Sequence, residues 1–204
     1  MTITFLGHAC FRLESGGYRI IIDPFKGVPG YPHTAGEAEA VCCSHDHFDH
    51  AFIRRIRLTE AGDSPFTVRK VKTCHDDQNG ALRGENTVHV FTADGVTVAH
   101  LGDLGHMPNA EQLAEIGKCD VLLLPIGGTY TLDIHGAKAV ADAVAPRVVV
   151  PMHYRRGEKG FEVLQTVDEF AAQYRGEDIH MLTESTLEVS DEILNRGGVV
   201  VFQA

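Results

Sequence analysis

Short apolar or alternating runs, separated by turns that contain glycine and proline, fill the first half of the chain and predict mostly strands. Ser15-Gly16-Gly17 and Asp94-Gly95 predict tight turns between neighbouring strands. Residues 26–37 are rich in Gly and Pro and predict a loop, whereas residues 49–58 predict a helix. The strands predicted in this half span residues 2–6, 9–14, 18–23, 38–43, 68–73, 87–92 and 96–101.

Helix-like and strand-like segments alternate in the second half of the chain. Residues 161–174 carry the clearest amphipathic stripe, with Phe161, Leu164, Val167 and Phe170 on one face. This order, without strict β-α-β repetition, predicts an α/β fold of two packed sheets covered by helices. The segments are helices at 108–116, 134–144 and 161–174, buried strands at 121–125 and 148–151, and edge strands at 186–189 and 199–202.

Length and composition favour one compact domain over residues 1–204. The chain has 204 residues, 44% of them hydrophobic, which suffices for one core. The formal charge of −10, with no long basic tract, weighs against a dedicated nucleic-acid surface. Five cysteines without a C-x-x-C pair predict reduced thiols, and no apolar run reaches the roughly 18 residues of a membrane span. The start of the chain lacks a signal-peptide pattern. We therefore expect a cytoplasmic protein without a membrane partner.

The segment 45–50, His-Asp-His-Phe-Asp-His, carries the strongest chemical signal in the chain. Neutral imidazoles and carboxylates are the ligands that borderline divalent metals prefer. On an extended backbone His45 and His47 point the same way, whereas Asp49 and His50 follow a turn and can address a second point. The spacing therefore indicates two adjacent metals. Asp46 has the outward phase and is expected to hydrogen-bond a neighbour or cap a helix rather than bind metal.

Three later strands also end in residues of the metal-ligand type. His75 follows the strand predicted at 68–73, Asp103 follows 96–101, and His153 follows 148–151. Strand ends that meet at one edge of a sheet are where α/β proteins build their sites. A single histidine of this kind is uninformative, but the joint pattern predicts one metal-binding site.

With these residues, the sequence resembles the metallo-β-lactamase superfamily from about residue 2 to residue 154. The resemblance is carried by the 45–50 motif, His75, the Gly102-Asp103 pair and His153. Further segments are similar to the branch that contains ascorbate-6-phosphate lactonase and the N-acyl-phosphatidylethanolamine phospholipase D enzymes. These segments are residues 5–11, 21–24, 124–131 and 150–154.

The resemblance implies a four-layer αββα sandwich, with two mixed sheets flanked by helices, and a dinuclear metal centre. It implies two divalent ions, zinc in the first instance with manganese or iron as alternatives. A hydroxide bridging the two ions would then attack the substrate, with Asp49 and Asp103 as catalytic residues. The implied ligands are His45, His47 and His75 for metal one, Asp49, His50 and His153 for metal two, and Asp103 as the bridge.

Other polar residues beside the predicted site have two interpretations each. His8, at the end of the first strand, either helps to bind or protonate substrate as a catalytic residue or is a structural histidine. Asp23 either hydrogen-bonds a ligand histidine or caps the turn before Pro24. The basic residues near the site either contact an anionic group of the substrate or are solvated loop charges; they are Arg83, Arg155 and Arg156.

These features together predict a metal-dependent hydrolase acting on a small anionic lactone or ester. One alternative is a phosphodiesterase or nuclease with the same dinuclear site. Another is a non-catalytic metal-binding protein, which has no physical need for so complete a ligand set. The expected partner is a small-molecule substrate, and the sequence leaves the oligomeric state open.

Overall fold

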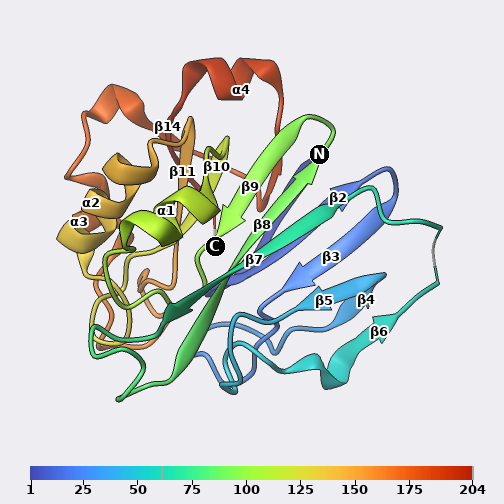
Figure 1. Ribbon diagram of the computed structural model, residues 1–204, viewed down its shortest axis with the longest axis horizontal. Coiled ribbons are helices and arrows are strands. Elements are labelled where there is room, and N and C mark those ends of the chain that lie inside the picture. The colour runs from blue at the N-terminus through green and yellow to red at the C-terminus, as the bar shows by residue number, and fades with distance from the viewer. Residues whose placement is uncertain (61, 204) are drawn as a thin grey trace.

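The computed structural model describes residues 1–60 and 62–203, which form two facing β-sheets with most of the helices on one side (Figure 1). The first sheet has five strands in the order β13-β1-β2-β3-β5. Strands β1 to β3 form an antiparallel meander, and β5 runs parallel to β3, so this sheet is mixed. Its strands are β1 (Thr2–Gly7), β2 (Cys10–Ser15), β3 (Tyr18–Ile22), β5 (Ala40–Cys42) and β13 (Thr186–Glu188), and a separate parallel pair is formed by β4 (Gly36–Ala38) and β6 (Ile56–Leu58).

The second sheet has seven strands in the order β12-β14-β11-β10-β9-β8-β7 and is also mixed. The first three of its strands along the chain are antiparallel neighbours, and the other pairings are parallel. The strands are β7 (Thr67–Cys74), β8 (Glu85–Ala93), β9 (Val96–His100), β10 (Val121–Pro125), β11 (Val148–Met152), β12 (Ile179–Met181) and β14 (Gly198–Val201).

Each α-helix begins at a polar side chain that accepts a hydrogen bond from the first turn. Asn109 and Thr166 form reciprocal capping boxes with Gln112 and Glu169, which satisfies two backbone donors at each helix start. Figure 1 shows α1, α2 and α3 on the outer side of the seven-stranded sheet. The helices are α1 (Ala110–Ile116), α2 (Ile134–Val144), α3 (Val167–Ala171) and α4 (Asp191–Arg196), with 3₁₀ turns η1 (Ile53–Arg55) and η2 (Gly176–Asp178).

Apolar side chains fill three layers of the fold. Between the sheets, residues such as Phe11 and Ile20 of the first sheet pack with Phe91 and Val150 of the second. A second cluster lies between the seven-stranded sheet and the helices, and there Phe170 of α3 is completely buried. On the outer face of the five-stranded sheet, apolar residues of the 24–34 loop cover β2 and β3. The predicted α/β fold with two mixed sheets is confirmed, and the 24–34 loop forms its outermost layer on the first sheet.

One predicted helix is wrong, and another is shorter than predicted. Residues 49–58 form a turn, η1 and β6, because the backbone of this segment is held by the neighbouring loop: Phe52 N–H donates to the Pro24 carbonyl. The helix predicted at 161–174 begins only after Thr166. Gln165 holds the chain extended before it, since its N–H donates to the Gly127 carbonyl and its side chain accepts from Ile134 N–H.

The topology brings the carboxyl ends of six strands to one region. Strands β1, β3 and β5 run in the same direction in the first sheet, and β7, β9 and β11 do so in the second. The loops that follow them carry the chemistry-bearing residues of the chain, in agreement with the expectation for strand ends. Among residues 1–60 and 62–203, the helices are too short or too polar to cross a membrane.

Candidate metal centre

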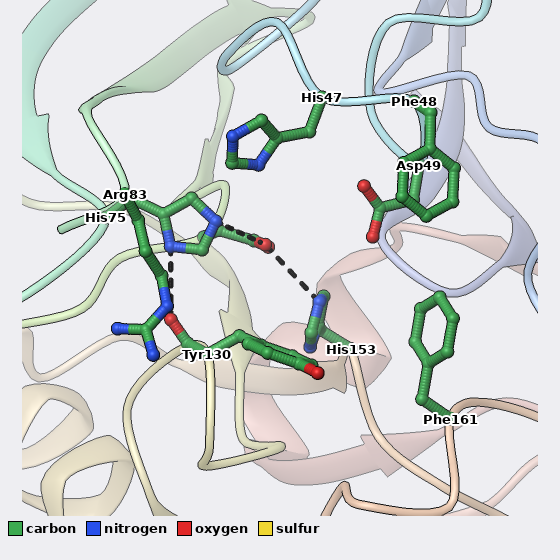
Figure 2. Close-up of a pocket in the computed structure, with 9 residues that line it drawn as sticks. His47, Phe48, Asp49, His75, Arg83, Tyr130, His153 and Phe161 are labelled. Carbon is green, nitrogen blue, oxygen red and sulfur yellow. Dashed lines mark hydrogen bonds and ion pairs between the residues drawn. The ribbon is translucent and has the colours of Figure 1, made fainter.

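A buried carboxylate, Asp103, lies at the centre of the site. Its Oδ2 atom is 3.1 Å from Nε2 of both His50 and His75, 3.3 Å from Nε2 of His153 and 3.9 Å from Nε2 of His45. In Figure 2, His75 and His153 point toward this common centre from opposite sides. The four imidazoles come from three separate loops, so only the folded chain assembles the ring of donors.

The donor atoms fall into three overlapping groups, one of which contains this carboxylate. The imidazoles of His45, His47 and His75 offer nitrogen atoms that all lie within 4.8 Å of one another. A second group with the same limit contains Asp49, His50 and His153, the residues that the resemblance assigns to metal two, and in addition His8. A third group, His45, His50 and Asp103, joins one histidine of each set to the central carboxylate. The predicted ligands thus lie close together, and their assignment to two separate ions stays a prediction.

Asp23 holds two of the histidines through a buried hydrogen-bond chain. His50 Nδ1 lies 2.8 Å from Asp23 Oδ2, and the Ser44 hydroxyl donates to the same oxygen at 2.6 Å. Ser44 Oγ in turn lies 2.9 Å from His45 Nδ1, while Ser44 N–H donates to Asp23 Oδ1. When each Nδ1 carries the proton, each Nε2 presents a lone pair to the centre, which is the form that binds metal. Of the two interpretations for Asp23, the hydrogen bond to a ligand histidine is the one observed.

Electrostatics favour ionised carboxylates at Asp49 and Asp103 and a neutral imidazole at His45. Burial alone would raise the pKa of Asp49, but the neighbouring His8 and His50 lower it to about 2. Burial likewise opposes the charge on Asp103, yet His153 and His50 hold its pKa well below the ordinary value. Burial and the proximity of His50 lower the pKa of His45 to about 3. His50 differs, because Asp103 and Asp23 outweigh burial and raise its pKa well above the ordinary value. The ionised carboxylates of Asp49 and Asp103 therefore make this centre favourable for a cation.

The residues present fit a metal, as their unsatisfied atoms show. Buried polar atoms normally find a hydrogen-bond partner, and leaving one without costs about 1–3 kcal/mol. Nε2 of His45, Nε2 of His50 and Oδ1 of Asp103 are buried without one, as are both ring nitrogens of His8. Unpartnered imidazole nitrogens and a carboxylate oxygen that converge in this way are the arrangement that a divalent cation satisfies.

The backbone around the centre adopts conformations that L-residues rarely take. His8, Asp23 and His153 have φ values of +57°, +49° and +54°. Such positions cost of order 1–3 kcal/mol each and cluster at functional sites. At Gly127, an added Cβ would overlap the carbonyl oxygen of His153, so only glycine permits this approach to the ligand loop.

A cavity of about 400 Å³ opens in front of the predicted metal ligands. Figure 2 shows the rings of Phe48, Tyr130 and Phe161 around it, with Arg83 on the side of His75. Its lining residues are His47, Phe48, Asp49, His75, Arg83, Asp103, Tyr130, His153 and Phe161. The cavity therefore combines a floor of ligand atoms, aromatic walls and one guanidinium.

Asp76 organises the loop that presents Arg83. The Asp76 carboxylate accepts hydrogen bonds from four backbone N–H groups, those of Gln78, Gly80, Leu82 and Arg83. These bonds lower the pKa of Asp76 to about 2, against the opposing effect of burial. The Arg83 side chain then donates to the Thr129 carbonyl at 3.0 Å, and its guanidinium lies 5.7 Å from the centre of the Tyr130 ring. The loop from β7 to β8 is thereby tied to the loop after β10.

The other candidate basic residues do not line this cavity. Arg155 Nε donates to the Leu164 carbonyl, and Arg156 donates to the Phe202 carbonyl. His8 does not line the cavity either, since it is 1% exposed and lies against Asp49 and His153. Burial, followed by the proximity of His153, lowers the pKa of His8 to about 4, so the neutral ring is the form at neutral pH.

Sequence reasoning missed the aromatic walls and Asp76. Phe161 was assigned to the buried stripe of a helix that does not form there, and no local signal marks Tyr130 as a wall of the site. Asp76 did carry a signal, because an aspartate followed by Gly80 is typical of a loop in which the carboxylate binds nearby backbone N–H groups.

Comparison with known proteins gives a consistent picture. Residues 2–153 match the family model described as Beta-lactamase superfamily domain. A UPF0173 metal-dependent hydrolase from Carboxydothermus hydrogenoformans is 30% identical over 242 residues, covering 98% of this chain and all (100%) of that protein. A Thermotoga maritima crystal structure, ascribed to a zinc-dependent hydrolase of the metallo-β-lactamase superfamily, has a TM-score of 0.77 and 35% identity and covers 98% of this chain and 97% of that one. An isothiocyanate hydrolase from Delia radicum gut bacteria, at 18% identity, TM-score 0.63 and coverage of 100% and 96%, is similar in fold alone.

Proposed function

Because this chain belongs to the metallo-β-lactamase superfamily, within the UPF0173 family of metal-dependent hydrolases, we propose that it hydrolyses a small anionic lactone or ester at a centre of two divalent ions. The observation that carries the proposal is the ring of unsatisfied imidazole and carboxylate atoms around Asp103, at the floor of a cavity with one guanidinium in its wall.

Two sets of side chains would bind the two ions. His45, His47 and His75 would hold one, Asp49, His50 and His153 the other, and Asp103 faces both groups. Imidazole and carboxylate suit zinc, and they accept manganese and iron as well. When bound, such ions lower the pKa of water to about 7 and polarise a substrate oxygen, so no strong side-chain base is needed.

The cavity walls support a substrate with a short apolar part and one anionic group. Phe48, Tyr130 and Phe161 give the apolar surface that excludes water around the reacting bond. Arg83 is the one Lys or Arg among the nine lining residues of the described chain, and its fork of N–H donors matches a carboxylate or a phosphate. One guanidinium suits a single small anion better than the repeated phosphates of a nucleic acid.

Proton release, followed with a pH indicator on metal-reconstituted protein, tests the proposal. The substrates are a sugar-phosphate lactone, a neutral lactone with the same ring, and a simple phosphodiester. We expect turnover of the lactones, absent in an Asp49→Ala protein. Arg83→Met should raise KM for the anionic lactone about 10- to 100-fold, the loss of a charge-assisted hydrogen bond, and leave the neutral lactone unchanged.

A matched control and two outcomes complete the design. Arg156→Met removes a guanidinium that does not line the cavity, and its KM values for the lactones should equal those of wild type. Turnover of the phosphodiester alone would replace the lactonase proposal with a phosphodiesterase. Metal-loaded protein inert toward all three substrates would support a non-catalytic metal-binding protein instead.

A further inference from the structure

His8 is the most anomalous polar side chain outside the seven predicted ligands. It follows β1, is 1% exposed, and neither of its ring nitrogens has a hydrogen-bond partner. His100, which is also fully buried, shows the ordinary arrangement: its Nε2 bonds the Ala9 carbonyl and its Nδ1 accepts from Gly102 N–H. A buried imidazole with both nitrogens unsatisfied requires a partner that the protein atoms do not supply.

The surroundings of His8 show where that partner would lie. Its Nε2 is 3.5 Å from Asp49 Oδ2, which is long for a hydrogen bond. Its ring centre is 4.2 Å from that of His153 and 5.4 Å from that of His50. With bonds of 2.0–2.1 Å, two ligand atoms on one tetrahedral zinc are about 3.3 Å apart. The distance between His8 Nε2 and Asp49 Oδ2 is therefore close to the distance between two ligand atoms bound to the same ion.

The backbone is bent to place His8 there. The pairing of β1 with β2 shifts register between Phe5 and Gly7, and His8 itself has a left-handed φ of +57°. Gly7 has a φ of +111°, and a Cβ at this position would press on the Tyr31 ring. The His8 carbonyl accepts the N–H of His153, which fixes the two histidine loops against each other. Strain of this kind persists where a functional group must be held in position.

We propose that His8 is the fourth side-chain ligand of the second metal position, beside Asp49, His50 and His153. The inference rests on the proposed dinuclear function and refines its ligand set. The two positions then differ: the first has three imidazoles, whereas the second has three imidazoles and a carboxylate, and Asp103 faces both. The second position thus suits an ion that accepts a higher coordination number than the four of a typical zinc site.

Proton NMR of the full chain loaded with Co²⁺ tests the assignment. An imidazole bound to this paramagnetic ion gives a strongly shifted ring N–H resonance, so at a pH and temperature where N–H exchange is slow these signals count the bound histidines. We expect six signals in the wild type, from His8, His45, His47, His50, His75 and His153. His8→Asn should show five, because asparagine tolerates the left-handed backbone but lacks the ring. The His8→Asn protein should also lose the ion at the second position to a chelator concentration at least 10-fold lower than the wild-type protein requires.

His89→Gln is the matched control, since His89 is equally buried, has an unpartnered Nδ1 and lies outside the donor groups. It should keep six signals and wild-type chelator resistance. Five signals in the wild type, with two ions bound, would overturn the role of His8 while leaving the proposed function intact. Fewer than two ions in the wild type would instead remove the dinuclear centre itself. If His8→Asn fails to fold, the wild-type count alone decides.

Discussion

Replacing Asp23 with asparagine should weaken metal binding by two predicted ligand histidines, His45 and His50. Asp23 accepts three hydrogen bonds, from Ser44 N–H, the Ser44 hydroxyl and His50 Nδ1. An amide can keep only some of them, because its NH₂ group donates where the carboxylate accepted. If the NH₂ group takes the Oδ2 position, His50 Nδ1 must become an acceptor, and the Ser44 hydroxyl turns to donate to His45. Both rings then carry their proton on Nε2, which faces the metal centre.

The expected magnitudes follow from those contacts. Residues that orient a ligand histidine typically change metal affinity 10- to 100-fold, which is about 1.4–2.8 kcal/mol. The metal-free protein should lose about 1.5–3 kcal/mol of unfolding free energy, since one charge-assisted hydrogen bond between buried groups is lost. Asparagine is the suitable replacement because Asp23 has a φ of +49°, a conformation that asparagine tolerates and alanine does not.

Competition with a chromogenic chelator measures the affinity, and urea unfolding of metal-free protein measures the stability. Asp94→Asn is the control, because Asp94 also has a left-handed φ and also accepts from a serine hydroxyl, that of Ser15, but at the β8–β9 turn. It should bind metal as wild type does. An Asp23→Asn protein whose metal affinity stays within twofold of wild type would refute the role given to the Asp23 hydrogen-bond chain.

Three further predictions address the ligand loop, the substrate loop and acid stability. Gly127→Ala should lower the unfolding free energy by about 1–3 kcal/mol in urea unfolding, because the methyl group displaces the His153 loop. Gly176→Ala is the control, since an added Cβ there meets open space without a left-handed φ, and it should change stability by less than about 0.5 kcal/mol. Asp76→Asn should raise KM for an anionic substrate more than for its neutral analogue, since the loop carrying Arg83 loosens; equal effects on both would contradict this. Burial lowers the pKa of His89 from 6.5 to about 4, so the unfolded chain binds more protons between these values and stability falls as pH drops through them. Between pH 7 and 4.5, the unfolding free energy of metal-free His89→Gln should therefore fall by about 2.5 kcal/mol less than that of metal-free wild type. Urea unfolding at the two pH values measures the difference.

The sequence predicted that the candidate ligands lie together, because most of them belong to loops that directly follow strands. His75 and His153 come after β7 and β11, where alternation or continuous apolar residues leave little doubt about the element. Metal ligands must also be imidazole or carboxylate, so the residue types are restricted. The helix prediction for residues 49–58 was wrong because the backbone of this segment bonds to the loop around Pro24. This is a tertiary contact, which local helix propensity does not include.

The position of His8 and the residues of the cavity walls could not be predicted from the sequence. A strand pattern does not reveal the register shift in β1 or the left-handed residue after it, and these turn His8 away from the cavity and toward Asp49. Arg83 and Arg155 were equivalent candidates in sequence, because each lies near a ligand histidine. Only the fold separates them, through the Asp76 hydrogen bonds that hold one at the cavity and the Leu164 contact that holds the other elsewhere.

The most direct test of the dinuclear centre is the metal content of the purified chain, measured together with hydrolysis, in wild type and in Asp103→Asn. Asp103 faces both donor groups, so its carboxylate is the one group on which both ions should depend. The account predicts two divalent ions per wild-type chain, and in the variant a loss of bound metal together with hydrolysis. Wild-type protein that hydrolyses its substrate with fewer than two ions, or an Asp103→Asn protein that retains both ions and full turnover, would contradict it.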